Sequence, residues 1–331
     1  MMADVTPNEI TLVEAVNLAL VHALEDDPRV LVLGEDVGVD GGVFRATDGL
    51  FEQFGPDRVF DTPLSEAGIG GLCVGLAAQD FRPVAEIQFM GFIHPVIDQL
   101  VNHASRLRTR TRGRLTCPMV LRAPYGGGIH APEHHSESTE AMLTHIPGLR
   151  VVIPSSPARA YGLLLAAIRV PDPVVFLEPK RIYRAVRESV ADTGEAQPLD
   201  YCFRLKEGKD LTLIAWGAMV EKVLEVAAEL EQEGVKAEVI DVATLKPLDF
   251  PTILTSVQKT GRCVIVHEAP LTAGYGAEIA ARLADEGLFY LRAPIKRVTG
   301  FDTVMPLARL EDHYIPSADR ILRAAREVLE L

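Results

Sequence analysis

The sequence predicts an α/β protein with two doubly wound domains. Short apolar runs alternate with longer segments in which apolar residues recur at helical spacing, and this alternation occurs twice along the 331 residues. The pattern is typical of mainly parallel sheets covered by helices. A stretch with few large apolar residues, 187–198, separates the two halves. We therefore expect a first domain over residues 1–190, a linker over residues 191–204 and a second domain over residues 205–331.

In the first half, the spacing of apolar residues predicts helices over residues 11–24, 67–78, 94–106 and 158–169. Strands are expected over residues 30–33, 82–89, 117–122, 149–153 and 174–177, with a short extended piece over 60–66. The first strand leads into the loop GEDVG at 34–38, and α/β proteins bind ligands at such loops. The helix at 67–78 contains four glycines, each of which costs roughly 1 kcal/mol relative to alanine. We expect another helix or another chain to approach it closely.

In the second half, residues 220–234 predict an amphipathic helix that ends at Gly234. Further helices are expected over residues 250–260, 275–286 and 321–331, and strands over 211–215, 237–241 and 262–266. This order again predicts a mainly parallel sheet.

Composition excludes several classes of function. The formal net charge of −13 argues against nucleic acid or an anionic membrane as the main partner. No uninterrupted apolar stretch approaches the roughly 20 residues of a membrane-spanning helix, and the first ten residues do not resemble a signal peptide. The four cysteines lie far apart among apolar residues, which indicates buried free thiols. We expect a cytoplasmic protein, although a processed organellar protein would have the same features.

Common phosphate, metal and nucleophile motifs are missing. The sequence has no P-loop, no strand-linked GxGxxG, and no Gly-Asp-Gly followed by Asn about 25–30 residues later. It also lacks HExxH and GxSxG. His134 and His135 are adjacent and therefore point in different directions, which makes them poor ligands for one metal ion.

Two features are candidates for chemistry. Glu66 enters the glycine-rich helix, where desolvation would raise its pKa and the helix amino terminus would favour its ionised form. A simple capping-region acid is the alternative. The loop GGGIHAPEHHS at 126–136 combines glycines and histidines directly after a predicted strand, a common place for acid–base groups. Ordinary surface histidines are the alternative there.

An ordered set of runs resembles the β chain of pyruvate and branched-chain 2-oxo-acid dehydrogenases: GEDVG at 34–38, GGVFRA at 41–46, DTPLSE at 61–66, RPVAEIQF at 82–89, RAPYGGG at 122–128, DPVVFLEPK at 172–180, KTGR at 259–262, VHEA at 266–269 and RVTG at 297–300. The resemblance implies a domain that binds the pyrimidine of thiamin diphosphate, followed by a domain of the transketolase C-terminal type. It also implies an α2β2 heterotetramer, in which the α subunit carries the diphosphate- and Mg²⁺-binding motif missing here. A lipoyl-bearing dihydrolipoyl acyltransferase core is the further partner that it implies.

The resemblance gives individual residues a role. It implies that Glu66 hydrogen-bonds the aminopyrimidine nitrogen of the cofactor, and that Gln88 and Phe92 line the pyrimidine pocket. His135 matches the histidine of a loop motif ending in His-Ser, and is expected to supply a proton during decarboxylation or transfer to lipoamide. His130 and His134 lie in the part of this loop that varies within the family.

A structural potassium site is also implied by the resemblance. The matching positions contribute backbone carbonyls and are Met119, Ala167, Val170 and Asp172. No other metal ligand set is expected on this chain.

The implied activity is oxidative decarboxylation of pyruvate with acyl transfer to lipoamide, because QFMGF at 88–92 and GIHAPE at 128–133 are closer to pyruvate-type chains. A branched-chain 2-oxo-acid or acetoin dehydrogenase β subunit is the alternative within the family. A non-catalytic docking subunit is an alternative from another class, and Glu66 and His135 in their motifs argue against it. The missing diphosphate motif argues against a stand-alone thiamin enzyme related to transketolase.

Overall fold

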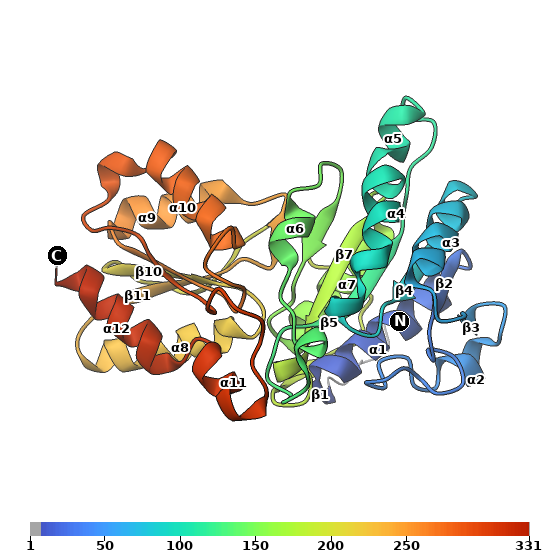
Figure 1. Ribbon diagram of the computed structural model, residues 1–331, viewed down its shortest axis with the longest axis horizontal. Coiled ribbons are helices and arrows are strands. Elements are labelled where there is room, and N and C mark those ends of the chain that lie inside the picture. Colours follow the sequence, from blue (N-terminus) through green and yellow to red (C-terminus); the bar gives the residue numbers. More distant parts are fainter. Residues whose placement is uncertain (1–7, 331) are drawn as a thin grey trace, which may run out of the picture.

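The structure, a computed structural model, describes residues 8–330 and shows two α/β units side by side (Figure 1). Residues 1–7, where we expected no targeting segment, and Leu331, the predicted end of the last helix, lie outside the described residues. Within residues 8–330, no helix is long and apolar enough to cross a membrane. The two α/β units confirm the predicted fold class.

The first unit is built on a seven-stranded sheet in the order β12-β6-β7-β5-β4-β2-β3. All its strands are parallel except β12, which runs antiparallel to β6. The strands are β2 (Val30–Gly34), β3 (Val59–Asp61), β4 (Arg82–Glu86), β5 (Val120–Tyr125), β6 (Arg150–Val152), β7 (Val174–Pro179) and β12 (Thr244–Lys246).

Helices cover both faces of this sheet, as alternate residues of β2 demonstrate. Val30 and Val32 belong to the apolar core that contains α1 and α7, whereas Leu31 and Leu33 belong to the core that contains α3. Since successive strand residues point to opposite faces, each face is covered by its own helices. The helices of this unit are α1 (Leu12–Asp26), α2 (Leu50–Phe54), α3 (Glu66–Ala78), α4 (Ile97–Asn102), α5 (Leu107–Arg110), α6 (Glu140–Thr144) and α7 (Pro157–Arg169).

The second unit has a five-stranded sheet in the order β14-β13-β10-β11-β9, in which only β9 is antiparallel. Its strands are β9 (Phe203–Lys206), β10 (Leu211–Ala215), β11 (Ala237–Asp241), β13 (Cys263–Val266) and β14 (Lys296–Val298). Its helices are α8 (Met219–Gln232), α9 (Phe250–Thr260), α10 (Tyr275–Glu286), α11 (Ala308–Tyr314) and α12 (Ala318–Leu329).

Two strand pairs connect segments that lie far apart in the sequence. β1 (Asn8–Thr11) pairs with β8 (Arg187–Val190), at the end of the predicted first domain. β12 belongs by sequence to the second half, yet it forms the edge of the first sheet. Both sheets are therefore joined through the chain that follows β11, and the domain limits at 190 and 205 stay a prediction.

The prediction of one helix over residues 94–106 is wrong. The segment divides into a 3-10 turn at His94–Val96, the helix α4, a second 3-10 turn at Ala104–Arg106 and the helix α5. His103 has φ −122° and ψ −68°, outside the helical range, and this residue interrupts the helix.

Candidate active site

The predicted site residues follow the carboxyl ends of neighbouring parallel strands. Glu66 comes after β3, the loop at 34–38 after β2, Gln88 and Phe92 after β4, and the loop with His135 after β5. Because β3, β2, β4 and β5 are adjacent in the sheet and parallel, these segments emerge at one edge. The topology therefore gathers residues that are up to 101 positions apart (34 to 135) in the sequence.

Three carboxylates gather at the amino terminus of α3. Glu66 is the first residue of α3, and the hydroxyl of Ser65 caps this helix by accepting from the Gly68 N–H. Burial and the negative charges of Asp36 and Glu66 raise the pKa of Glu35. Glu66 is half-buried. The cluster is thus open on one side, and this chain alone does not enclose Glu66.

Gln88 connects this cluster to the next strand. Its amide Nε2 donates to Asp36 Oδ2 over 3.0 Å. The bond fixes the orientation of the Gln88 side chain and leaves its carbonyl oxygen without a bond among the described residues. A polar acceptor is therefore held between two strand ends.

His135 lies in an aromatic enclosure. Its ring centroid is 4.4 Å from that of Phe89 and 5.2 Å from that of Phe92, both in edge-on geometry. Its Nδ1 is buried and has no hydrogen-bond partner among the described residues. The backbone at Gly91 also lies very close to the loop that carries His135, because a Cβ added at Gly91 would be only 1.9 Å from the carbonyl oxygen of His134. The structure brings His135 and Phe92 together, whereas His134 points into solvent.

A buried ion network under this edge was not predicted from the sequence. Arg122 on β5 is fully buried and donates to Glu178 on β7 over 2.7 and 2.9 Å, and to Glu86 on β4 over 3.0 Å. Tyr183 donates to Glu178 over 2.5 Å. The two carboxylates raise the pKa of Arg122 against the effect of its burial. The network ties together the three strands from which Gln88, the glycine loop and Lys180 emerge.

The pairing of the strands explains why these three side chains meet. Glu86, Arg122 and Glu178 lie on one face of the sheet: Glu86 pairs with Arg122, and Glu178 pairs with Pro124, two residues beyond Arg122. A charged residue inside an otherwise apolar strand was the only signal in the sequence.

The four residues of the predicted potassium site are brought to the opposite edge of the sheet. The carbonyl of Met119 accepts from the Val174 N–H over 2.9 Å, which places the start of β5 beside Asp172. The carboxylate of Asp172, however, accepts from Arg108 over 2.6 Å and from Arg150 over 3.3 Å. Occupation by potassium stays a prediction.

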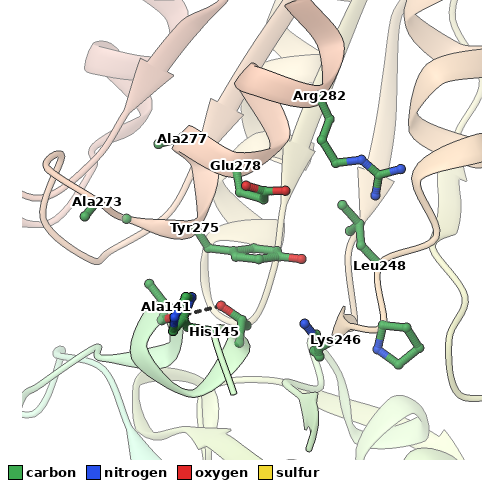
Figure 2. Close-up of a pocket in the computed structure, with 12 residues that line it drawn as sticks. Ala141, His145, Lys246, Leu248, Ala273, Tyr275, Ala277, Glu278 and Arg282 are labelled. Atoms are coloured by element: carbon green, nitrogen blue, oxygen red, sulfur yellow. Dashed lines mark hydrogen bonds between the residues drawn. The ribbon is translucent and has the colours of Figure 1, made fainter. Parts of the chain in front are cut away.

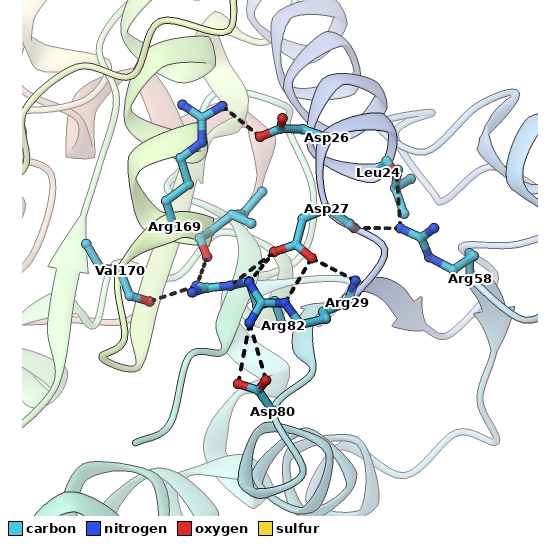
Figure 3. A network of polar contacts seen from close by, with 10 residues as sticks. Leu24, Asp26, Asp27, Arg29, Arg58, Asp80, Arg82, Arg169 and Val170 are labelled. Atoms are coloured by element: carbon cyan, nitrogen blue, oxygen red, sulfur yellow. Dashed lines mark hydrogen bonds and ion pairs between the residues drawn. The ribbon is translucent and has the colours of Figure 1, made fainter. Parts of the chain in front are cut away.

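Arg82 also lies at this edge (Figure 3). Its guanidinium donates to the carbonyls of Ile168 over 2.7 Å and Val170 over 3.4 Å at the end of α7, and its Nε is 3.4 Å from Asp27. The positive charge of Arg82 already compensates the partial negative charge at the carboxyl end of α7. Arg82 therefore competes with any cation for the Val170 carbonyl.

A large cavity is separate from the candidate site. It measures about 680 Å³ and lies between the two units, lined by α10 residues such as Tyr275, Glu278 and Arg282 on one side and His145 and Lys246 on the other (Figure 2). None of the predicted site residues lines it. Across residues 8–330, no group of three or more His, Cys, Asp or Glu side chains is arranged to hold a metal ion.

Comparison with known proteins identifies the family. Residues 8–186 match the transketolase pyrimidine-binding domain, and residues 200–321 match the transketolase C-terminal domain. The chain is 48% identical over 322 residues to the pyruvate dehydrogenase E1 component subunit beta of Bacillus subtilis (strain 168), covering 97% of this chain and 99% of that one. The chain belongs to the pyruvate dehydrogenase E1 β-subunit family.

Other relatives agree with this family. The subunits of the same name from Staphylococcus epidermidis and Staphylococcus aureus are 48% and 47% identical over the same 97% of this chain and 99% of theirs. A solved structure described as a split-gene transketolase, an inactive β4 tetramer, superposes with a TM-score of 0.80 at 26% identity, covering 98% of this chain and 99% of that one. Family and fold are thus supported by independent comparisons.

Proposed function

We propose that this chain is the β subunit of a thiamin-diphosphate-dependent enzyme that decarboxylates pyruvate oxidatively and transfers the acyl group to lipoamide. The observation that carries the proposal is the convergence of Glu66, Gln88, Phe92 and His135 at one edge of a parallel sheet, in a chain of the pyruvate dehydrogenase E1 β-subunit family. The relatives named above are pyruvate dehydrogenase subunits, so the branched-chain and acetoin alternatives are not favoured.

The residues at this edge fit the pyrimidine end of thiamin diphosphate. An aminopyrimidine presents ring nitrogens and an amino group, which need a carboxylate, an amide and an apolar face. Glu66 supplies the carboxylate and Gln88 keeps an amide oxygen free, while Phe92, which packs against His135, supplies an aromatic face. When bound, the cofactor supplies an electron sink at its thiazolium ring for decarboxylation of the 2-oxo acid.

Glu66 is proposed to share a proton with a pyrimidine nitrogen. This role needs a carboxyl group whose pKa is raised, and burial is the usual cause of such a rise. The negative charge of Glu66 lies close enough to Glu35 to help raise the pKa of that neighbouring carboxyl group, after burial and Asp36. A partner subunit that covers the half-buried Glu66 would add the desolvation that this chain alone lacks.

His135 is proposed to exchange a proton with the substrate side of the site. Its Nδ1 is buried and has no hydrogen-bond partner among the described residues, so this nitrogen is available to a ligand. Phe89 and Phe92 exclude water from the two sides that they cover. An imidazole has the pKa range for proton transfer near neutral pH.

The partner is proposed to be an α subunit in an α2β2 heterotetramer, which would also hold the diphosphate and Mg²⁺. Apolar side chains just before α3 and along it are exposed: Leu64, two residues before Glu66, is 72% exposed, and Leu72 is 42% exposed. Gly75 lies one turn beyond Leu72, and a Cβ added there would meet nothing within 4 Å. This face of α3 leaves room for a closely approaching helix. A lipoyl-bearing acyltransferase core and a cytoplasmic location stay predictions.

The substitution Glu66→Gln tests the proposed role of Glu66. We expect the assembled variant to bind thiamin diphosphate more weakly and to lose pyruvate decarboxylation by about 100-fold or more, since the side chain can no longer share an acidic proton. Glu52→Gln, on the exposed face of α2, is the matched control. Full cofactor affinity and full activity in Glu66→Gln would refute the role.

A further inference from the structure

We infer that two buried carboxylates of the second unit, Glu268 and Glu311, hold the glycine loop of the first unit and thereby position His135. This inference rests on the proposed function, because it assigns positioning residues to the same site. We call Glu268 and Glu311 the loop clamp. They belong to the second unit and bind a loop of the first unit.

Hydrogen bonds join the glycine loop to both carboxylates. The Gly127 N–H donates to Glu268 Oε2 over 3.0 Å. The Gly128 N–H donates to Glu311 Oε1, and His130 Nδ1 lies 3.0 Å from Glu311 Oε2. Each carboxylate therefore binds backbone or ring groups of the loop rather than a basic side chain of its own unit.

Both carboxylates of the loop clamp are buried. Glu268 is 2% exposed and Glu311 is fully buried, although both are acids. Buried carboxylates are costly unless hydrogen-bonded, and hydrogen bonds with charged acceptors are stronger than neutral ones. The loop N–H groups thus provide much of the stabilisation that these carboxylates receive.

Lys180 is a buried amine near the loop clamp. This side chain follows β7 at the same sheet edge, is 3% exposed, and has no hydrogen-bond partner among the described residues. Burial lowers the pKa of Lys180 to about 7, and the negative charges of Glu268 and Glu311 oppose this shift. The Lys180 amine lies 5.9 Å from the centroid of Phe89, a ring that contacts His135. Lys180 therefore links the loop clamp to the aromatic enclosure, and in its protonated form it compensates the charge of the two carboxylates.

The backbone shape of the glycine loop connects the clamped residues to His135. Gly126 and Gly128 have φ of +81° and +95°, and a Cβ at Gly126 would lie 2.7 Å from Glu268 Oε2. The Gly126 N–H donates to the Glu137 carbonyl over 2.9 Å and closes the base of the loop. Movement of residues 127–130 is consequently transmitted to His135, which lies between the clamped segment and this closed base.

Hydrogen exchange tests the loop clamp independently of catalysis. In the assembled heterotetramer, Glu311→Ala should accelerate exchange of the amides at Gly127 and Gly128 by at least about tenfold, because a charged acceptor is lost. Glu311→Gln keeps a carbonyl acceptor and should restore most of the protection. Asp312→Ala, at the exposed neighbouring position of α11, is the control and should exchange like the unmodified protein.

Kinetics then test positioning. Glu311→Ala should lower kcat for pyruvate at least about tenfold while the affinity for thiamin diphosphate changes less than about twofold, since Glu66 is untouched. Should Glu311→Ala fail to assemble, Gly128→Ala replaces it with the same expected results, because it retains every buried charge. Unchanged exchange overturns the clamp; faster exchange with unchanged kcat overturns its role in positioning His135. An unmodified complex without 2-oxo-acid activity would instead refute the proposed function.

Discussion

Removing Arg122 should strongly destabilise the first unit. The substitution Arg122→Met keeps a long side chain but leaves Glu86 and Glu178 buried without their counter-charge, since both are at most 2% exposed. Removing one partner of a buried ion pair costs about 3–5 kcal/mol. For a unit of this size, 1 kcal/mol corresponds to about 2–4 °C in Tm, so Tm should fall by roughly 6–20 °C.

The loss should also depend on pH. Burial raises the pKa of Glu86 and the negative charge of Glu178 raises it further, whereas Arg122 lowers it. Without Arg122 the folded-state pKa of Glu86 rises, and a carboxyl group with a raised folded pKa loses stability as pH increases through that pKa. The deficit in Tm should therefore shrink when pH is lowered from about 8 to about 5.

Differential scanning calorimetry of the assembled protein at one scan rate measures both effects. Arg323→Met, at an exposed position of α12, is the control and should change Tm by less than about 2 °C. Adding Glu86→Gln and Glu178→Gln to Arg122→Met should recover part of the loss, because no uncompensated charge then remains. A Tm within 2 °C of the unmodified protein, or a pH-independent deficit, would contradict this reasoning.

Four further predictions concern other parts of the fold. Burial raises the pKa of Glu140 to about 7. The contribution of protonated Glu140 to folding stability is therefore fully present below about pH 4.5 and is lost as pH rises through 7. Glu140→Gln should flatten the decline of Tm over this range in thermal scans. Arg82→Met removes the 2.7 Å bond to the Ile168 carbonyl and should lower the free energy of unfolding by about 2 kcal/mol in urea titrations. Gly70→Val should destabilise by about 1–3 kcal/mol, because a Cβ there lies 2.9 Å from a valine methyl group. Gly75→Leu should leave the chain at least as thermally stable, because leucine is a better helix former than glycine, yet weaken association with the α subunit in sedimentation experiments.

Each of these has a result that contradicts it. Equal pH profiles of Tm would exclude the titration of Glu140, and an unchanged urea midpoint would exclude the role of Arg82. Unchanged stability of Gly70→Val would mean that α3 is not closely packed at this point. Unchanged association of Gly75→Leu would show that the α subunit does not approach this face of α3.

The alternation of apolar strands and helices predicted most of the fold. The strand β10 and the helix α9 lie where the sequence placed them, at Leu211–Ala215 and Phe250–Thr260. Such elements are long, regular and apolar on one face, so local periodicity is sufficient to find them. Short elements were missed, including β12 and β14, because three residues carry no period and their pairing depends on distant strands.

The candidate site was predicted only in part, for a similar reason. Glu66, Gln88, Phe92 and His135 were found through a family resemblance, and their convergence follows from the strand order. Glu268 and Glu311 were not singled out, because their role depends on contacts between two units that local sequence does not encode. The four glycines of α3 were predicted to allow close approach, and Gly70 does so within the chain, against the turn at His94–Val96.

The central claim is that this chain contributes half of a thiamin-diphosphate site and needs an α subunit for activity. The most direct measurement is thiamin-diphosphate-dependent oxidation of pyruvate with an artificial electron acceptor, for this chain alone and co-expressed with its α subunit. We expect activity only in the pair, with pyruvate preferred over 3-methyl-2-oxobutanoate. Activity of the chain alone, or none in a stable and fully assembled pair, would contradict the account.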